Sequence, residues 1–302
     1  MQLGMVGLGK MGANMTLRLS RGGHQLVVFD VDPEAVSSVT GMTDNATGTS
    51  SLEELVSVLE PPRAVWIMVP SGEITDSTIE ALSGYLAEGD TIIDGGNSRY
   101  TDSIQHAAAL KSNGIGFVDA GTSGGIWGLD EGFCLMIGAE PADYERLEPV
   151  FATLAPADGY ARVGMPGAGH FTKMVHNGVE YALMQAYGEG FDLLANSDLD
   201  LKVEEIAEVW RHGSVVRSWL LDLAASALKK DPGLESISGF VEDSGEGRWT
   251  VETAIDQATP TPAIAVALFS RFASRREDTF SNRMIAALRR EFGGHAVQPR
   301  DS

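Results

Sequence analysis

The sequence predicts an α/β fold: a doubly wound parallel sheet in the first half of the chain and an all-helical domain in the second. In the first half, short β-rich runs alternate with helical stretches, which is typical of right-handed βαβ units. After Gly169 the β-rich runs disappear and long helical stretches follow. The chain has 302 residues, and single cores stop growing at roughly 250 to 300 residues. Two domains are therefore expected.

The candidate elements follow one another in a regular order. Strands are expected at residues 2–7, 25–30, 64–69, 91–94, 115–119 and 133–137. Residues 11–20 and 52–59 have the apolar spacing of helices, as do residues 170–196 and 203–228 in the second half. Residues 163–169 are rich in helix and strand breakers. We therefore expect one domain at residues 1–165 and a second at residues 166–302.

Composition and charge exclude several classes of partner and location. The formal net charge of −20 argues against nucleic acid or an anionic membrane, since both require a basic face. Gly, Pro and charged residues interrupt every apolar segment before the roughly 18 residues that a membrane span needs. A β-rich run begins at Gln2, too early for a signal segment, so we expect a cytoplasmic protein. Cys134 lies in an apolar run and is expected to be a buried, inert thiol.

A glycine-rich turn follows the first expected strand. Gly7, Gly9 and Gly12 form a G-x-G-x-x-G motif between a strand and a helix, the context of a dinucleotide-binding turn. The glycines permit the tight turn and the close approach of a pyrophosphate, which the helix N-terminus attracts. The motif predicts a Rossmann-type domain; a plain glycine-rich turn is the alternative. Cofactor contacts are expected from Gly7, Leu8, Gly9, Lys10, Met11, Gly12 and Val69.

The second strand ends in Asp30, which favours NAD over NADP. A carboxylate about 20 residues beyond the glycines hydrogen-bonds the adenosine ribose hydroxyls. The same charge repels a 2′-phosphate, and no arginine directly follows Asp30. We therefore expect NAD as the cofactor. Asp32, ahead of Pro33, is interpreted as a helix-capping residue.

Polar side chains capable of proton transfer or hydrogen bonding share one face of the first long helix. They recur at helical spacing and are Lys173, His176, Asn177, Glu180 and Tyr181. A solvated stripe is the alternative, but such stripes prefer flexible Lys, Arg and Glu side chains. Apolar residues flank the polar face. The pattern favours a helix that is buried on most sides and turns one side to a ligand.

Two loops contain groups that suit an anion rich in oxygen. The first covers residues 94–98, after an apolar strand, and includes Asn97. The second covers residues 121–125 and includes Ser123, Gly124 and Gly125. Both lie at the carboxyl ends of strands, where open α/β sheets bind their ligands. Plain turns are the alternative for either loop alone.

These segments resemble the 6-phosphogluconate dehydrogenases of the β-hydroxyacid dehydrogenase superfamily. The matching segments are residues 7–12, 93–98, 123–125 and 167–181, with further matches at 248–250 and 292–295. The resemblance spans nearly the whole chain, and the length is that of the short form. It implies oxidative decarboxylation of 6-phosphogluconate to ribulose 5-phosphate and carbon dioxide, with NAD as hydride acceptor and without a metal.

The resemblance also implies roles for individual residues. Lys173 would be the base that takes the substrate's hydroxyl proton, which requires a neutral amine. Glu180 would be the acid that protonates the enediol carbon after carbon dioxide leaves. The remaining hydroxyl and carboxylate groups of the substrate would be held by Asn97, Ser123, Gly124, Gly125, His176 and Asn177. Asn97 would also contact the cofactor.

The phosphate end departs from the pattern of the longer family members. Their Lys-Gly-Thr-Gly-Lys-Trp run appears at residues 244–249 as Ser-Gly-Glu-Gly-Arg-Trp, so Ser244 replaces the phosphate-binding lysine. Arg271 still matches a family phosphate ligand, with Tyr181 beside it as a further substrate-binding residue. Arg289 and His295 match a tail that family members insert into a neighbouring subunit, which implies a homodimer or homotetramer. An ordinary surface ion pair is the alternative for each arginine.

Two other functions are compatible with parts of the sequence. One is a β-hydroxyacid dehydrogenase for a small acid such as 3-hydroxyisobutyrate, whose members share Lys173 and Asn177 but generally lack His176 together with Glu180. The other is a non-catalytic NAD-binding sensor. A sensor has no use for an acid and a base on one helix face, so Lys173 and Glu180 favour the enzyme.

Overall fold

The computed structural model describes residues 1–276 and 279–293, and it divides into two compact units. The first contains residues 1–176 and the second begins at Asn177. The division falls inside the long helix α8 (Ala168–Ala195), after the N-terminal turns of that helix. The sequence-based division at 165/166 precedes this helix and stays a prediction.

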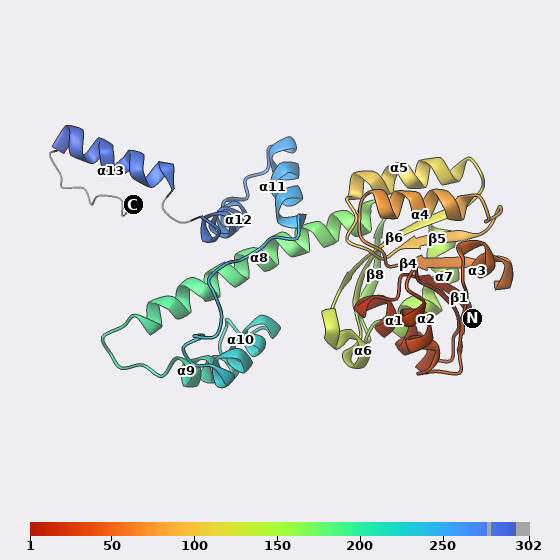
Figure 1. The fold of residues 1–302 in the computed structure, drawn as a ribbon, viewed down its shortest axis with the longest axis horizontal. Helices are drawn as coiled ribbons and strands as arrows, with labels where there is room; N and C mark the ends of the chain where they lie inside the picture. Colours follow the sequence, from red (N-terminus) through yellow and green to blue (C-terminus); the bar gives the residue numbers. More distant parts are fainter. Residues whose placement is uncertain (277–278, 294–302) are drawn as a thin grey trace. The chain divides into compact units, whose positions relative to one another are not determined.

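The first unit is built on an eight-stranded sheet with the order β3-β2-β1-β4-β5-β6-β7-β8 (Figure 1). The strands are β1 (Gln2–Val6), β2 (Gln25–Phe29), β3 (Ala46–Gly48), β4 (Ala64–Ile67), β5 (Thr91–Asp94), β6 (Gly116–Ser123), β7 (Cys134–Gly138) and β8 (Tyr160–Gly164). The strand pairs are parallel except β6 with β7, which is antiparallel. The predicted doubly wound sheet is confirmed, with one antiparallel pair added.

Helices cover both faces of this sheet. They are α1 (Lys10–Arg21), α2 (Pro33–Thr40), α3 (Leu52–Val58), α4 (Glu73–Ser83), α5 (Tyr100–Lys111), α6 (Gly128–Glu131) and α7 (Pro141–Leu154), with the short 3₁₀ helix η1 (Gly125–Trp127). Met15 of α1 and Phe151 of α7 belong to one apolar core. Leu55 of α3 and Leu82 of α4 belong to the other. The two cores account for the continuous burial of strands such as β4 and β5.

The second unit is helical, as predicted. After the end of α8 it contains α9 (Val203–Arg211), α10 (Trp219–Lys230), α11 (Glu246–Asp256), α12 (Pro262–Ser274) and α13 (Phe280–Gly293). The prediction of one continuous helix at residues 203–228 is wrong. The chain leaves the helix after Arg211, passes Gly213 with a φ of 79°, and restarts where the Ser218 side chain caps α10.

Two further expectations about β6 and β7 are also wrong. Residues 121–123 are not a loop, because β6 continues through Ser123 while it pairs with β7. Cys134 is exposed, not buried. It is the first residue of β7 and pairs with Ser123, the last residue of β6, so it lies at the end of the strand pair beyond the core.

Candidate active site

The glycine turn after β1 has the geometry that a bound pyrophosphate needs. Gly7 has a φ of 90°, and a Cβ there would lie 2.5 Å from the carbonyl oxygen of Met68. At Gly12, a Cβ would lie 2.0 Å from the Gly7 carbonyl oxygen, so α1 can approach only because no side chain is present. Gly9 precedes α1 without any side-chain cap, and the space beside it is open. The N–H groups at this helix end can therefore meet an anion.

The other residues of the predicted cofactor site surround this turn. Leu8 is buried, Lys10 is exposed and Met11 is half-buried. Val69, just beyond β4, is close to the turn, because a Cβ at Gly7 would lie 3.1 Å from its Cγ1. The structure thus brings the predicted residues of the turn together with Val69.

Asp30 lies at the end of β2, next to the glycine turn. Its Oδ2 accepts a hydrogen bond from the backbone N–H of Leu8 at 2.6 Å, and its Oδ1 accepts one from Asp32 N–H at 2.9 Å. These bonds fix the carboxylate between the turn and the start of α2. Asp32 caps α2 by accepting from the N–H of Glu34, as predicted. The carboxylate thus lies beside the glycine turn, and its predicted role toward the ribose of the cofactor stays a prediction.

Asn97 lies in the loop after β5, and its side chain is exposed. The loop is held to β4 by a hydrogen bond from Gly95 N–H to the carbonyl of Ile67 at 3.0 Å. Within the part of the chain that the structure describes, Asp94 Oδ2 and Ser98 Oγ are buried without a hydrogen-bond partner. The loop therefore combines an exposed amide with buried polar atoms at the carboxyl end of the sheet.

The Ser123 to Gly125 segment turns sharply at the end of β6. Gly124 has a φ of 132° and Gly125 a φ of 55°, values that favour glycine at both positions. Ser123 is half-buried, and Gly125 begins η1. The segment is a tight turn at the carboxyl end of a central strand, which is the location predicted for it.

The N-terminus of α8 is anchored to β6 by Asp119, which the sequence analysis did not identify. The carboxylate of Asp119 accepts hydrogen bonds from Gly167 N–H at 2.6 Å and from His170 N–H at 2.7 Å. Burial raises the pKa of Asp119 to about 6, outweighing the charge of His170 and the two backbone hydrogen bonds, which lower it. A lone aspartate within an apolar strand is the signal that could have revealed this anchor.

Lys173 is placed by a close contact between α8 and β6. A Cβ at Gly121 would lie 2.5 Å from the Cβ of Lys173, so the helix approaches the strand where the side chain is missing. A Cβ at Gly169 would lie 2.2 Å from the carbonyl oxygen of Asp119. Lys173 is only 6% exposed. The buried side chain of Lys173 therefore begins beside the segment of β6 that was predicted to bind the substrate.

The polar face of α8 is not a solvated stripe. Asn177 and Tyr181 are buried, as Lys173 is, and His176 and Glu180 are half-buried. Of the apolar residues that flank this face, Val175 and Val179 are exposed, whereas Met174 is buried. Lys173 and Glu180 are seven residues apart on one continuous helix, so they lie on the same side of it, two turns apart.

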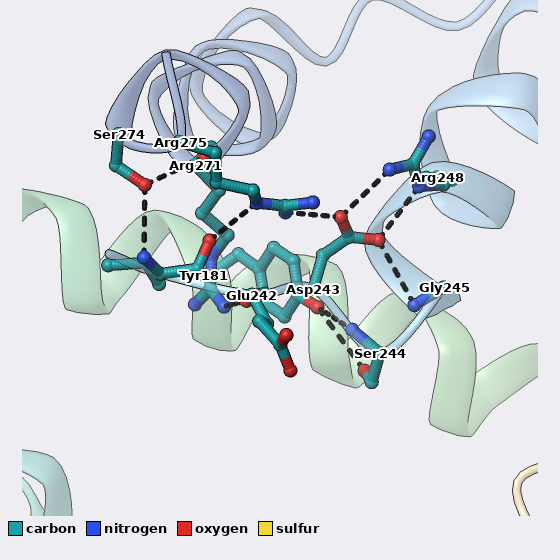
Figure 2. A network of polar contacts seen from close by, with 10 residues as sticks. Tyr181, Glu242, Asp243, Ser244, Gly245, Arg248, Arg271, Ser274 and Arg275 are labelled. Atoms are coloured by element: carbon teal, nitrogen blue, oxygen red, sulfur yellow. Dashed lines mark hydrogen bonds and ion pairs between the residues drawn. The ribbon is translucent and has the colours of Figure 1, made fainter. Parts of the chain in front are cut away.

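Tyr181 is the centre of a polar network in the second unit (Figure 2). Its hydroxyl accepts a hydrogen bond from Ser244 N–H at 3.0 Å and lies 3.2 Å from Ser244 Oγ. The guanidinium of Arg271 lies 3.6 Å from the centre of the Tyr181 ring and donates to the carbonyl of Glu242 at 2.9 Å. The structure thus brings together Tyr181, Arg271 and Ser244, the three positions assigned to the phosphate end.

Asp243 binds the other two arginines of this network. Arg248 donates to its carboxylate from Nε at 2.8 Å and from Nη2 at 2.9 Å, and Arg275 donates from Nη2 at 2.5 Å. The guanidinium of Arg248 holds the pKa of Asp243 well below its usual range. Within the described residues Arg271 contacts a carbonyl, a ring and a thioether but no carboxylate. Of the three arginines in this network, Arg271 is therefore the one whose charge could bind an anionic ligand.

Two predicted ligands lie outside what the structure describes. His295 follows the last described residue. Arg289 belongs to α13, but its side chain is not described. Their predicted contribution to a neighbouring subunit stays a prediction.

None of the helices in the described part of the chain has both the length and the apolar character needed to cross a bilayer. Among the same residues, no group of three or more His, Cys, Asp or Glu side chains is arranged to hold a metal ion.

A glycine turn on a doubly wound sheet, followed by a helical unit, defines an NAD-binding oxidoreductase. Residues 2–165 match the NAD binding domain of 6-phosphogluconate dehydrogenase, and residues 169–291 match the C-terminal domain of that enzyme. The chain therefore belongs to the 6-phosphogluconate dehydrogenase family.

Relatives cover the whole chain. The NAD(+)-dependent, decarboxylating 6-phosphogluconate dehydrogenase of Haloferax volcanii is 42% identical over 100% of both chains. YqeC of Bacillus subtilis, provisionally named a 6-phosphogluconate dehydrogenase, is 47% identical over 99% of both chains. Among solved structures, Plasmodium falciparum 6-phosphogluconate dehydrogenase, studied with NADP+ and with 6-phosphogluconate, superposes with a TM-score of 0.85 at 25% identity. That match covers 100% of this chain and 67% of the Plasmodium chain.

Proposed function

We propose that the chain oxidises 6-phospho-D-gluconate to D-ribulose 5-phosphate and carbon dioxide with NAD as the hydride acceptor, a step of the pentose phosphate pathway. The observation that carries the proposal is the polar face of α8, where Lys173, Asn177 and Tyr181 are buried while the flanking valines are exposed. Asn177 hydrogen-bonds to Glu246 and Tyr181 to Ser244, so these side chains are held in place. Several polar groups held on one buried helix face are typical of an active site, which supports the proposal.

Lys173 would be the general base. It would accept the proton of the hydroxyl at C3 while the hydride at that carbon leaves for NAD, whose chemistry in the reaction is to accept it. The product of this step is a β-keto acid. The protonated amine of Lys173 can then donate a hydrogen bond to the new ketone oxygen, which favours loss of the carboxyl group at C1 as carbon dioxide.

Glu180 would complete the reaction as a general acid. Loss of carbon dioxide leaves an enediol between the former C2 and C3. A proton delivered to the former C2, which becomes C1 of the product, converts the enediol into the ketone ribulose 5-phosphate. Glu180 is half-buried and lies on the Lys173 side of α8, two turns further along the helix. Lys173 and Glu180 lie on the same face of α8, so the base and the acid could act on one substrate in successive steps.

The substrate would be held at both ends. Asn97, the Ser123 to Gly125 turn, His176 and Asn177 would bind its hydroxyl and carboxylate groups. The phosphate would meet Arg271 and Tyr181, with Arg289 and His295 arriving from another copy of the chain. The proposal thus includes a homo-oligomer, and we place the enzyme in the cytoplasm.

NAD rather than NADP would be the preferred cofactor. Asp30 supports this part of the proposal, because its carboxylate is fixed beside the glycine turn by Leu8 and Asp32. Val31, the next residue, is exposed and carries no charge that could bind a 2′-phosphate. The relative from Haloferax volcanii is named NAD(+)-dependent, in agreement with this preference.

The proposed function is tested with purified protein in a spectrophotometric assay. NADH formation is followed by its absorbance with 6-phosphogluconate as substrate, and carbon dioxide release is measured in parallel. The assay is repeated with NADP and with 3-hydroxyisobutyrate. Turnover of 3-hydroxyisobutyrate without turnover of 6-phosphogluconate would overturn the proposal, and so would absence of reduction with any of these substrates.

A further inference from the structure

Helices α8 and α11 touch within the second unit because glycines lie at the contact. A Cβ at Gly178 would lie 2.7 Å from Cγ2 of Thr250, and a Cβ at Gly247 would lie 2.5 Å from the ring of Tyr181. The two helix backbones can approach this closely only without those side chains. As a consequence, the first residue of α11, Glu246, comes next to Asn177 on α8.

Glu246 is a buried acidic residue. It is only 3% exposed, and its Oε2 accepts a hydrogen bond from Nδ2 of Asn177, which is 8% exposed. Its position as the first residue of α11 favours a carboxylate, since the N-terminal end of a helix attracts negative charge. A buried carboxylate is tolerated when it is paired in this way.

The chemistry of this pair fixes the orientation of the Asn177 amide. An ionised carboxylate can only accept hydrogen bonds, whereas an amide has donors on nitrogen and acceptors on oxygen. The Asn177 nitrogen must therefore face Glu246, and the amide oxygen lies on the opposite side of the group. A glutamine at position 246 could either donate or accept, so it would permit both orientations of Asn177.

We propose that Glu246 is a positioning residue for the sugar acid: it holds the amide nitrogen of Asn177 so that the amide oxygen is the atom offered to a substrate hydroxyl. This inference rests on the proposed function, which assigns Asn177 to the substrate. It explains why a carboxylate, and not an amide, occupies the contact.

The first test uses Glu246→Gln, which keeps the size of the side chain and its ability to hydrogen-bond. The apparent KM for 6-phosphogluconate is expected to rise roughly tenfold, the effect of misdirecting one buried hydrogen bond. The KM for NAD and the urea concentration at the unfolding midpoint are expected to stay at wild-type values. A role in stability alone would shift the midpoint and leave the KM unchanged.

Glu235→Gln is the matched control. It removes a charge from an exposed side chain of the same unit that has no role in the proposed site. We expect wild-type kinetics for this variant. A tenfold rise in KM for both variants would attribute the effect to lost negative charge and overturn the role of Glu246.

The second test exchanges donor and acceptor. Asn177→Asp places two carboxylates face to face, so its unfolding midpoint is expected to fall. Adding Glu246→Gln restores one amide and one carboxylate, and the double variant is expected to regain most of the lost midpoint. Equal midpoints for Asn177→Asp and the double variant would show that the two side chains do not pair, which overturns the inference.

The two inferences fail in different ways. A wild-type chain that forms no NADH from 6-phosphogluconate overturns the proposed function, while the midpoints of the exchange series still report on the pair. An active wild-type chain with unchanged kinetics in Glu246→Gln overturns the positioning role alone.

Discussion

Gly121 on β6 has no side chain, and the first carbon of the Lys173 side chain on α8 occupies the space that this leaves. A Cβ at position 121 would lie 2.5 Å from the Cβ of Lys173, closer than two carbon atoms can approach. The missing side chain therefore sets where the side chain of Lys173, the proposed base, begins. Asp119 fixes the same helix end by accepting from the backbone N–H groups of Gly167, just before the helix, and His170, within it.

Gly121→Ala is expected to reduce kcat strongly by displacing Lys173. Either the helix or the strand must move, and displacement of a catalytic group by about 1 Å can cost roughly 100-fold in rate. Steady-state kinetics with 6-phosphogluconate and NAD measure the loss. Gly188→Ala is the control, because it lies on the same helix with open space around it. Equal kcat values for Gly121→Ala and the control would contradict the placement of Lys173.

Glu180→Gln is expected to fold and to bind substrate while losing most turnover. The amide cannot protonate the enediol, and loss of a general acid typically costs roughly 100- to 10,000-fold. Calorimetric titration with 6-phosphogluconate checks binding, and NADH formation checks turnover. Glu189→Gln, an exposed glutamate on the same helix, should behave like the wild type. Full activity in Glu180→Gln would remove this residue from the mechanism.

Asp30→Ser combined with Val31→Arg is expected to move cofactor preference toward NADP. The change removes a charge that repels the 2′-phosphate and adds one that binds it, and a charged hydrogen bond contributes roughly 1.5 to 3 kcal/mol. Val31 is 91% exposed, so the arginine disturbs no core. The ratio of kcat/KM with NADP to kcat/KM with NAD should be at least roughly tenfold higher in the double variant than in Val31→Arg alone. An unchanged ratio would refute the role of Asp30.

The sheet and the cofactor turn could be predicted from the sequence because their signals are local. The glycine motif, the apolar strand runs and the carboxylate at the end of β2 each lie within a few residues of the structure that they specify. The break between α9 and α10 was missed because residues 203–228 keep a helical apolar spacing, and the turn at Gly213 interrupts it.

The contacts that organise α8 join residues distant in sequence, so local patterns did not reveal them. Asp119 binds a backbone N–H 51 residues away, and Glu246 binds an amide 69 residues away. The polar groups that meet are set by how closely the backbone of α8 approaches those of β6 and α11. Glycines at 121, 178 and 247 permit this close approach. The sequence predicted the polar helix face but not the residues that hold it.

The buried carboxylate of Asp119 should make stability depend on pH. Its pKa is about 6 in the folded chain, against an ordinary aspartate value of about 3.8, so between these values the folded state binds more protons than the unfolded state. Stability is therefore lost as pH rises from 4 to 6, by an amount on the order of 2 to 3 kcal/mol. Asp119→Asn cannot titrate. The free energy of unfolding in urea is measured for both proteins at about pH 4 and 7. The difference between the two proteins reports on Asp119 alone, since their other titrating groups are the same.

The stability of wild type relative to Asp119→Asn is expected to be larger at the lower pH. Asp119→Asn should be the less stable protein throughout, because one amide oxygen cannot replace both oxygens that accept from Gly167 and His170. A difference that is constant with pH would show that Asp119 keeps an ordinary pKa.

Arg271→Lys is expected to weaken binding of the phosphorylated substrate although the charge is kept. The guanidinium of Arg271 is planar, stacks on the Tyr181 ring and donates to Glu242, and an ammonium group cannot reproduce this fixed geometry. We expect the apparent KM for 6-phosphogluconate to rise roughly tenfold, with the KM for NAD unchanged. Arg276→Lys, an exposed arginine just beyond α12, is the control. If both variants retain the wild-type KM, Arg271 does not bind the phosphate, and the Tyr181 network serves only to hold the loop at residues 241–245.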